Sequence, residues 1–322
     1  MNPNMYAALG IFFAIILMIS IFLQEPLYQR FGPDTDPEIF DLLTPTKQTS
    51  INNVPSVQYQ AEEHAGILFC TMLSDDFHNY AHGAIRLVST LKTDFPRMHS
   101  AVIELEEKRI PAPVWNKLQV AGWDRLITLH RIAPRHEGAE LISRFKDQFT
   151  KLHLWNLTAY RWVFYMDSDV LIVRSLKPMV RHVLTFSTNS TTMWAIEDLP
   201  WFPGSFNAGI LAVSPNATEF SLLMDLLHGS IQFSEGWAEQ GFLNAVYQGR
   251  WQHLPIEFGL NLCFWSDRRD DWKAHSRKTQ AVHFTMIKPW DWFCPWTQYA
   301  PLCSLFWKRN SMQFHPIDTD WS

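Results

Sequence analysis

The sequence has 322 residues, 47% of them hydrophobic, and a formal net charge of −5. The hydrophobic fraction is typical of a folded globular protein and excludes a disordered chain. Nucleic-acid binding needs a concentration of lysine and arginine, and no run of this sequence supplies one, so we expect no nucleic-acid partner.

The first 23 residues differ from the rest of the chain. Residues 5–23 contain no charged side chain, and as a helix they would roughly span a hydrocarbon layer of ~30 Å. No basic residue precedes this run and no small-residue cleavage site follows it, which favours a retained signal anchor over a cleaved signal peptide. Residues 24–63 are polar and rich in proline, which indicates a stem or linker. The folded domain is therefore expected at 64–322.

The cysteines and glycosylation sequons agree with an oxidising lumen. The four cysteines form no CxxC pair, so a zinc ribbon is not expected. Cys294 and Cys303 are close enough in sequence to form a disulfide, although the sequence leaves open whether they do. Cys70 lies in an apolar strand pattern and is expected to be a buried thiol. Asn-x-Ser/Thr sequons occur at Asn156, Asn189 and Asn216, and Asn189 has the most polar surroundings.

Short apolar runs alternate with helical patterns from residue 66 onward. We expect strands at 66–72, 100–104, 125–129 and 162–166, and helices at 114–121, at 149–160 and around Ala84–Leu91. This alternation predicts an α/β fold with a mixed, mainly parallel sheet flanked by helices. Ligands of such folds bind beyond the carboxyl ends of the strands.

An acidic pair follows the strand predicted at 162–166. Asp167 and Asp169 stand at i and i+2, so both carboxylates can reach one hard cation while Ser168 points away. One alternative is a pair of solvated turn acids. However, apolar runs on both sides predict that the carboxylates are buried, which costs several kcal/mol unless a partner compensates. A metal ion that bridges a diphosphate would be such a partner.

Several segments resemble, in order and in rough spacing, the glycogenin-like branch of glycosyltransferase family 8. They are TKLHLWNLTAY at 150–160, VFYMDSDVL at 163–171, SFNAGILAVSP at 205–215, EQGFLN at 239–244 and HFTMIKPW at 283–290. The resemblance covers roughly residues 66–292. It implies a GT-A fold (the Rossmann-like fold of nucleotide-diphospho-sugar transferases), a UDP-sugar donor, a Mn²⁺ or Mg²⁺ ion and retention of anomeric configuration.

The resemblance also implies a metal and diphosphate site. Asp167, Asp169 and His283 would hold the ion, with Ser168 between the two acids in the same donor site. Neutral imidazole and carboxylates suit Mn²⁺, although from the residues alone His283 could equally be a core histidine. Lys288 would contact the diphosphate, and its alternative is an ordinary surface lysine.

The rest of the donor site follows from the same resemblance. Lys151 would lie at the donor. The uridine would contact Thr71, Leu73 and Tyr80, although Tyr80 could equally be packing. The transferred sugar would face Asn207, Asp198 and Gln240, with Gln240 near the anomeric carbon. Asp198 matches only if one residue of slippage is allowed.

The sequence departs from the family at two places. Glu239 replaces the family's aspartate, which lengthens the carboxylate by one methylene. The interval from His283 to Lys288 lacks the usual glycine and is one residue shorter than in glycogenin, so we expect a differently shaped phosphate loop. No segment matches the tyrosine that glycogenin glucosylates on itself, so a self-glucosylating primer is not expected.

These observations predict a retaining, metal-dependent glycosyltransferase. It would move a glucose-, galactose- or GlcNAc-like hexose from a UDP-sugar to a glycan or glycoprotein acceptor, by front-face attack because no nucleophile is apparent. The alternatives are a nucleotide-sugar hydrolase and an inactive sugar-binding protein. The tryptophans near the C-terminus could serve an acceptor site, packing or a membrane surface. We expect a single-pass type II protein of the Golgi or endoplasmic reticulum membrane with a lumenal catalytic domain, although few charges flank the anchor to fix its orientation.

Overall fold

The computed structural model describes residues 66–308, apart from 135–144, 189, 191, 200–201 and 230. The anchor expected at 5–23, the stem expected at 24–63 and the sequon at Asn189 lie outside the described residues. Within the described part, no helix combines the length and the apolar character that crossing a membrane requires.

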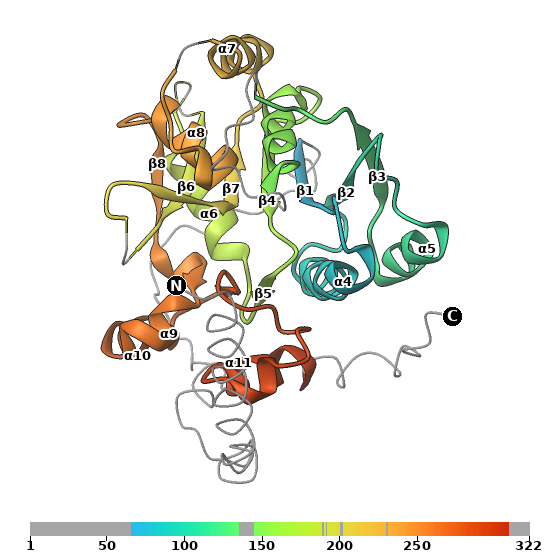
Figure 1. The fold of residues 1–322 in the computed structure, drawn as a ribbon, viewed down its shortest axis with the longest axis vertical. Helices are drawn as coiled ribbons and strands as arrows, with labels where there is room; N and C mark the ends of the chain where they lie inside the picture. Colours follow the sequence, from blue (N-terminus) through green and yellow to red (C-terminus); the bar gives the residue numbers. More distant parts are fainter. Residues whose placement is uncertain are drawn as a thin grey trace, which may run out of the picture.

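A seven-stranded mixed sheet forms the centre of the described part of the chain (Figure 1). The strand order is β3-β2-β1-β4-β7-β6-β8. β7 pairs antiparallel with β4 and β6, whereas the other neighbours pair in parallel. The mainly parallel sheet predicted from the sequence is therefore confirmed. The strands are β1 (Ile67–Met72), β2 (His99–Leu105), β3 (Arg125–Leu129), β4 (Trp162–Met166), β6 (Met193–Glu197), β7 (Phe206–Val213) and β8 (Gln252–Leu254).

Helices cover both faces of this sheet because the central strands are apolar on both sides. Alternate residues of β1 enter two different cores: Ile67 and Phe69 pack in one, and Leu68 and Cys70 in the other. The first core is closed by α4 (Phe77–Asp94), α5 (Ala112–Ala121) and α6 (Lys177–Phe186). The second is closed by η2 (Gln148–Asn156), α7 (Ala217–Leu227) and α8 (Ala238–Val246). Cys70 is a buried free thiol, as predicted, and burial raises its pKa.

The helix predicted at 149–160 is wrong in type and in length. The segment is the 3₁₀ helix η2, which ends at Asn156. Phe149, Leu152 and Trp155 are spaced by three, and all three are almost completely buried. A 3₁₀ helix aligns side chains at i and i+3, so this spacing places all three side chains on one side of η2, against the sheet. An α-helical pattern contains the same spacing, which is why the sequence did not separate the two.

A second, three-stranded sheet lies beyond the end of β4. It consists of β5 (Val170–Ile172), β10 (Ala281–His283) and β9 (Leu260–Asn261), in the order β5-β10-β9. β10 runs antiparallel to β5 and pairs His283 with Val170. A third core forms around this sheet with α9 (Cys263–Asp267), α10 (Arg269–Ser276) and α11 (Ala300–Lys308).

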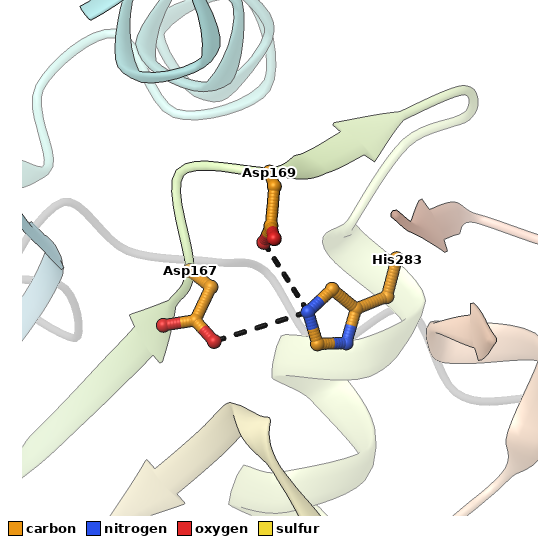
Figure 2. Close-up of side chains that lie close together, drawn as sticks. All are labelled: Asp167, Asp169 and His283. Atoms are coloured by element: carbon orange, nitrogen blue, oxygen red, sulfur yellow. Dashed lines mark ion pairs between the residues drawn. The ribbon is translucent and has the colours of Figure 1, made fainter. Parts of the chain in front are cut away.

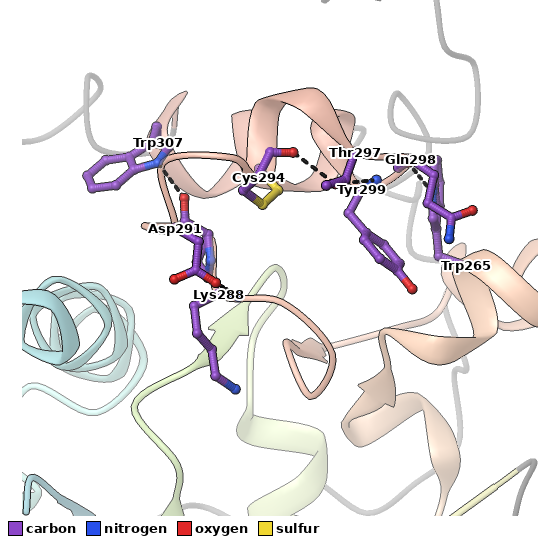
Figure 3. The surroundings of a disulfide bond; sticks show 10 residues. Trp265, Lys288, Asp291, Cys294, Thr297, Gln298, Tyr299 and Trp307 are labelled. Atoms are coloured by element: carbon purple, nitrogen blue, oxygen red, sulfur yellow. Dashed lines mark hydrogen bonds between the residues drawn. A yellow bond between two sulfur atoms is a disulfide. The ribbon is translucent and has the colours of Figure 1, made fainter. Parts of the chain in front are cut away.

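A disulfide joins Cys294 to Cys303, with a Cα–Cα distance of 6.2 Å (Figure 3). It links η5 (Cys294–Trp296) to α11, and the indole of Trp307 in α11 donates a hydrogen bond to the carbonyl of Pro289. Both links fasten the segment that directly follows Lys288. The sequence left open whether Cys294 and Cys303 form a disulfide, and the structure shows that they do.

Candidate functional site

The two aspartates and the distant histidine meet where β4 ends. Asp167 and Asp169 lie in the turn between β4 and β5, and His283 is the last residue of β10 (Figure 2). His283 Nε2 lies 3.2 Å from Asp169 Oδ1 and 3.8 Å from Asp167 Oδ2. One ligand atom from each of the three residues lies within 4.8 Å of the others. The pairing of β5 with β10 produces this proximity, because it fixes His283 beside Val170.

The donor set fits a hard divalent cation. Asp169 is buried, and its Oδ1 accepts no hydrogen bond within the described part of the chain. Burial alone would raise the pKa of this carboxyl, but Lys288 and His283 outweigh that effect and hold the pKa below its usual value. A buried, ionised carboxylate with an unused oxygen is suited to bind a metal ion. Two carboxylates and an imidazole are ligands that Mn²⁺ and Mg²⁺ accept.

Two glycines shape this site, and the sequence reasoning missed their role. A Cβ on Gly209 would lie 2.1 Å from Cε1 of His283, so only glycine leaves room for the imidazole. A Cβ on Gly83 in α4 would lie 1.9 Å from the carbonyl oxygen of Ser168. Ser168 itself is buried, with its backbone against α4, between the two aspartates. The block at 205–215 that resembles the family contains Gly209, but the sequence does not show why a glycine is needed there.

Lys288 occupies the other side of Asp169. Its ammonium contacts Asp169 Oδ2 and donates to the carbonyl oxygen of Phe284 at 2.8 Å. Burial would lower the pKa of Lys288, but the carboxylate of Asp169 outweighs it and raises the pKa. Asp291 accepts a hydrogen bond from the Lys288 backbone N–H and so fixes the turn (Figure 3). The lysine is therefore a fixed cation beside the candidate metal ligands.

Lys151 is buried between two carboxylates of the site. Its side chain is 3% exposed, and its ammonium lies 3.0 Å from Asp167 Oδ1 and 2.9 Å from Glu239 Oε1. Tyr165 also donates to Asp167 Oδ1, at 2.5 Å. Lys151 and Tyr165 thus hold one oxygen of Asp167 and leave Oδ2 facing His283.

Lys151 and Glu239 both have shifted pKa values, and the predicted contact of Lys151 with the donor stays a prediction. Burial would lower its pKa, but the two carboxylates raise it, so the lysine stays charged. Glu239 has a raised pKa because of burial, which Lys151 only partly offsets. Sequence reasoning missed Tyr165, although a residue two positions before Asp167 on a strand points to the same side.

The predicted sugar-facing residues form one hydrogen-bonded group. Asp198 accepts from Gln240 Nε2 at 2.9 Å and from Asn207 Nδ2 at 3.4 Å. Asn261, which the sequence reasoning did not select, donates to the same carboxylate at 3.5 Å. Burial raises the pKa of Asp198, and the amide donors oppose this rise. Gly209 N–H donates to Asn207 Oδ1, so this group directly adjoins the glycine beneath His283.

The residues predicted to contact uridine lie at the end of β1 and in the first turns of α4. Thr71 is completely buried, and its hydroxyl has no hydrogen-bond partner among the described residues. The side chain of Leu73 packs in the core. The ring of Tyr80 packs edge-on against Trp290, with ring centroids 5.0 Å apart. This contact fits the packing role that the sequence left open for Tyr80. Their contacts with a nucleotide stay predictions.

The fold and the site together define a class: GT-A-like α/β proteins with an Asp-x-Asp pair after a central strand. The chain is similar in structure to an active-site mutant of LgtC, with a TM-score of 0.54, 15% identity, and coverage of 78% of this chain and 98% of that one. It is also similar to galactosyltransferase LgtC in complex with donor and acceptor sugar analogues, with a TM-score of 0.51, 16% identity and coverage of 78% and 98%.

Sequence comparisons show which proteins the chain is similar to. Residues 143–294 match the model of Glycosyl transferase family 8. The chain is 29% identical over 233 residues to glycogenin-1 of Caenorhabditis elegans, which covers 68% of this chain and 50% of that protein. It is 27% identical over 224 residues to UDP-glucuronate:xylan alpha-glucuronosyltransferase 2 of Arabidopsis thaliana, covering 66% of this chain and 34% of that protein. The chain thus spans half or less of the length of these two relatives. These similarities support a glycosyltransferase of family 8.

A Gly209→Ala substitution is expected to disturb the metal site without unfolding the protein. The added methyl group would overlap the imidazole of His283 and displace its Nε2 from the two aspartates. We expect Mn²⁺ affinity to fall by about tenfold or more, and we expect the same of His283→Ala. Electron paramagnetic resonance of free Mn²⁺ measures this loss.

Gly66→Ala is the control, because its added Cβ would meet nothing closer than 3.2 Å. Unchanged Mn²⁺ binding in a folded Gly209→Ala protein would contradict the role assigned to this glycine.

Proposed function

We propose that the protein is a retaining, metal-dependent glycosyltransferase that moves a hexose from a UDP-sugar to a glycan or glycoprotein acceptor. The observation that carries the proposal is the convergence of Asp167, Asp169 and His283, from distant segments, beside the fixed ammonium of Lys288. Solvated turn acids would not need a buried histidine and a partly buried lysine around them. A divalent ion with a diphosphate accounts for all four groups.

The residues around Asp198 favour a neutral hexose as the transferred sugar. Its described hydrogen-bond partners are the carboxamides of Gln240, Asn207 and Asn261. The Arabidopsis relative is named for UDP-glucuronate, whose sugar carries a carboxylate. A second carboxylate beside Asp198 would be repelled, since carboxamides provide no compensating charge. A glucose-, galactose- or GlcNAc-like sugar, which presents hydroxyl or acetamido groups, suits this arrangement better.

The side chains of the site would act mainly through electrostatics. A bound Mn²⁺ or Mg²⁺ supplies Lewis-acid stabilisation of the leaving diphosphate. Lys288 would exchange its contact with Asp169 for the diphosphate, so its charge opposes the negative charge that develops as the glycosidic bond breaks. Lys151 and Tyr165 keep Asp167 oriented throughout. Asp198 is engaged by amide donors rather than free to attack, which agrees with front-face transfer and retention.

Asp169→Asn is expected to abolish transfer while the protein stays folded. The substitution keeps the size of the side chain but removes the charge that a hard cation requires. We expect transfer to fall at least about a hundredfold, equivalent to roughly 2.7 kcal/mol of transition-state stabilisation. The measurement is UDP release from a panel of UDP-sugars with Mn²⁺, with and without glycan acceptors.

The same panel separates the proposed function from its alternatives. Acceptor-stimulated UDP release by the wild type supports a transferase. Release that no acceptor stimulates would indicate a hydrolase, and the absence of release from every donor would indicate a sugar-binding protein. Full activity of Asp169→Asn would contradict the metal site.

We further propose that residues 5–23 anchor the protein in a Golgi or endoplasmic reticulum membrane, with the domain in the lumen. The disulfide between Cys294 and Cys303 agrees with an oxidising compartment. The sequon asparagines Asn156 and Asn216 are both exposed, although Asn216 also caps α7 through its side-chain oxygen. These observations support the location without depending on the enzyme's specificity.

The full-length chain is expected to remain in the membrane pellet after an alkaline carbonate wash. A helix of this length and apolarity resists extraction, whereas peripheral proteins are released. A variant lacking residues 5–23 serves as the control. Release of the full-length protein into the supernatant would rule out the anchor.

A further inference from the structure

Two half-exposed aromatic rings meet near the Asp198 group. Phe202 is 42% exposed and Trp237 is 47% exposed. Their ring centroids lie 4.8 Å apart and their planes are inclined by 72°. The rings therefore form a corner, called here the aromatic corner, whose surfaces are open to solvent. Two exposed aromatic rings in contact make a continuous apolar surface, which is more informative than a single exposed ring.

The backbone ties each ring of the corner to a predicted sugar-facing residue. The N–H of Phe202 donates to the carbonyl of Asp198 at 3.0 Å. Trp237 directly precedes α8, which carries Gln240 in its first turn. Gln240 in turn donates to the Asp198 carboxylate at 2.9 Å. The aromatic corner is thus connected to Asp198 and Gln240, the residues predicted to face the donor sugar.

The segment that presents Trp237 is built rather than incidental. A Cβ on Gly241 would lie 2.2 Å from the carbonyl oxygen of Ser234, so glycine is needed for the turn before α8 to fold back on the helix. Ala238, between Trp237 and Glu239, has a φ of 46°. This conformation is costly for a residue with a Cβ, and such strain is concentrated at ligand sites. The strained residue is the junction between Trp237 and α8.

A series of contacts connects the candidate metal ligands with the aromatic corner. Gly209 lies beneath His283, and its N–H binds Asn207, which contacts Asp198. A sugar linked to a diphosphate at the metal ligands would reach Asp198 and Gln240 first. The next ring outward would meet Phe202 and Trp237.

We propose that Phe202 and Trp237 form the acceptor subsite and stack against a six-membered sugar ring of the acceptor glycan. Pyranose rings have an apolar C–H face and a rim of hydroxyl groups. The aromatic corner matches the first, and the neighbouring carboxylate and carboxamide side chains match the second. This inference rests on the proposed function, because it assigns the second substrate of the same site.

Acceptor kinetics of the full-length protein test the subsite. The probes are the methyl α- and β-glycosides of glucose, galactose and N-acetylglucosamine, whose aglycones cannot stack. Trp237→Ala and Phe202→Ala are expected to raise the KM for the accepted glycoside by about fivefold or more, while UDP release without acceptor stays unchanged. Trp237→Phe keeps a ring and should retain most of the affinity.

Phe186→Ala provides the matched control. Phe186, the last residue of α6, is 61% exposed, and its ring contacts His182. Its removal should leave the acceptor KM unchanged. An unchanged KM in both Trp237→Ala and Phe202→Ala would overturn the proposal. The proposal would also be overturned if Trp237→Ala and Phe202→Ala lost UDP release without acceptor as much as they lost transfer to the acceptor. The rings would then serve donor binding or the stability of the fold.

Direct binding separates this proposal from the proposed transferase activity. If the wild type releases no UDP from any donor, the transferase proposal fails, and saturation-transfer NMR with the same methyl glycosides still tests the corner. Signals present in the wild type and lost in Trp237→Ala support the subsite. Absence of signals in the wild type, or their persistence in Trp237→Ala, would overturn it.

Discussion

The burial of carboxylates at the end of β4 is the constraint on which the rest of the site depends. Asp169 and Glu239 are buried, and Asp167 is partly buried beside them. Two ammonium groups face these three carboxylates: Lys151 bridges two of them and Lys288 contacts the third. Leaving one such carboxylate without a partner would cost several kcal/mol. The excess of negative charge that remains is what a divalent cation would neutralise.

This constraint explains why distant parts of the chain converge. The seven-stranded sheet presents Asp167 at the carboxyl end of a central strand, as parallel architectures do with ligand-binding residues. The small sheet then returns β10 alongside β5 and delivers His283. η2, on the other face, delivers Lys151. Each helix or strand buries its own apolar face, so the cost of assembling the charged group is offset by the cores around it.

The fold was predictable because short apolar runs and helical spacing are local signals. The strands at Ile67–Met72 and Arg125–Leu129 occur where the pattern placed them. The position of His283 was different, since nothing local marks a histidine after a strand as a partner of residues more than a hundred positions earlier; only the family resemblance linked them. The contacts of Lys151 with Asp167 and Glu239 were not predicted, because a sequence does not reveal which carboxylates surround a buried cation. Nothing in the sequence marked Trp237 as an exposed ring, because tertiary packing decides which side chains are exposed.

The central claim is that one divalent ion, held by two segments of the chain, makes the diphosphate site. Calorimetric titration of UDP into the metal-stripped full-length protein, with and without Mn²⁺, tests it most directly. The account predicts that Mn²⁺ tightens UDP binding by about tenfold or more, about 1.4 kcal/mol. The same UDP affinity with and without Mn²⁺ would contradict it.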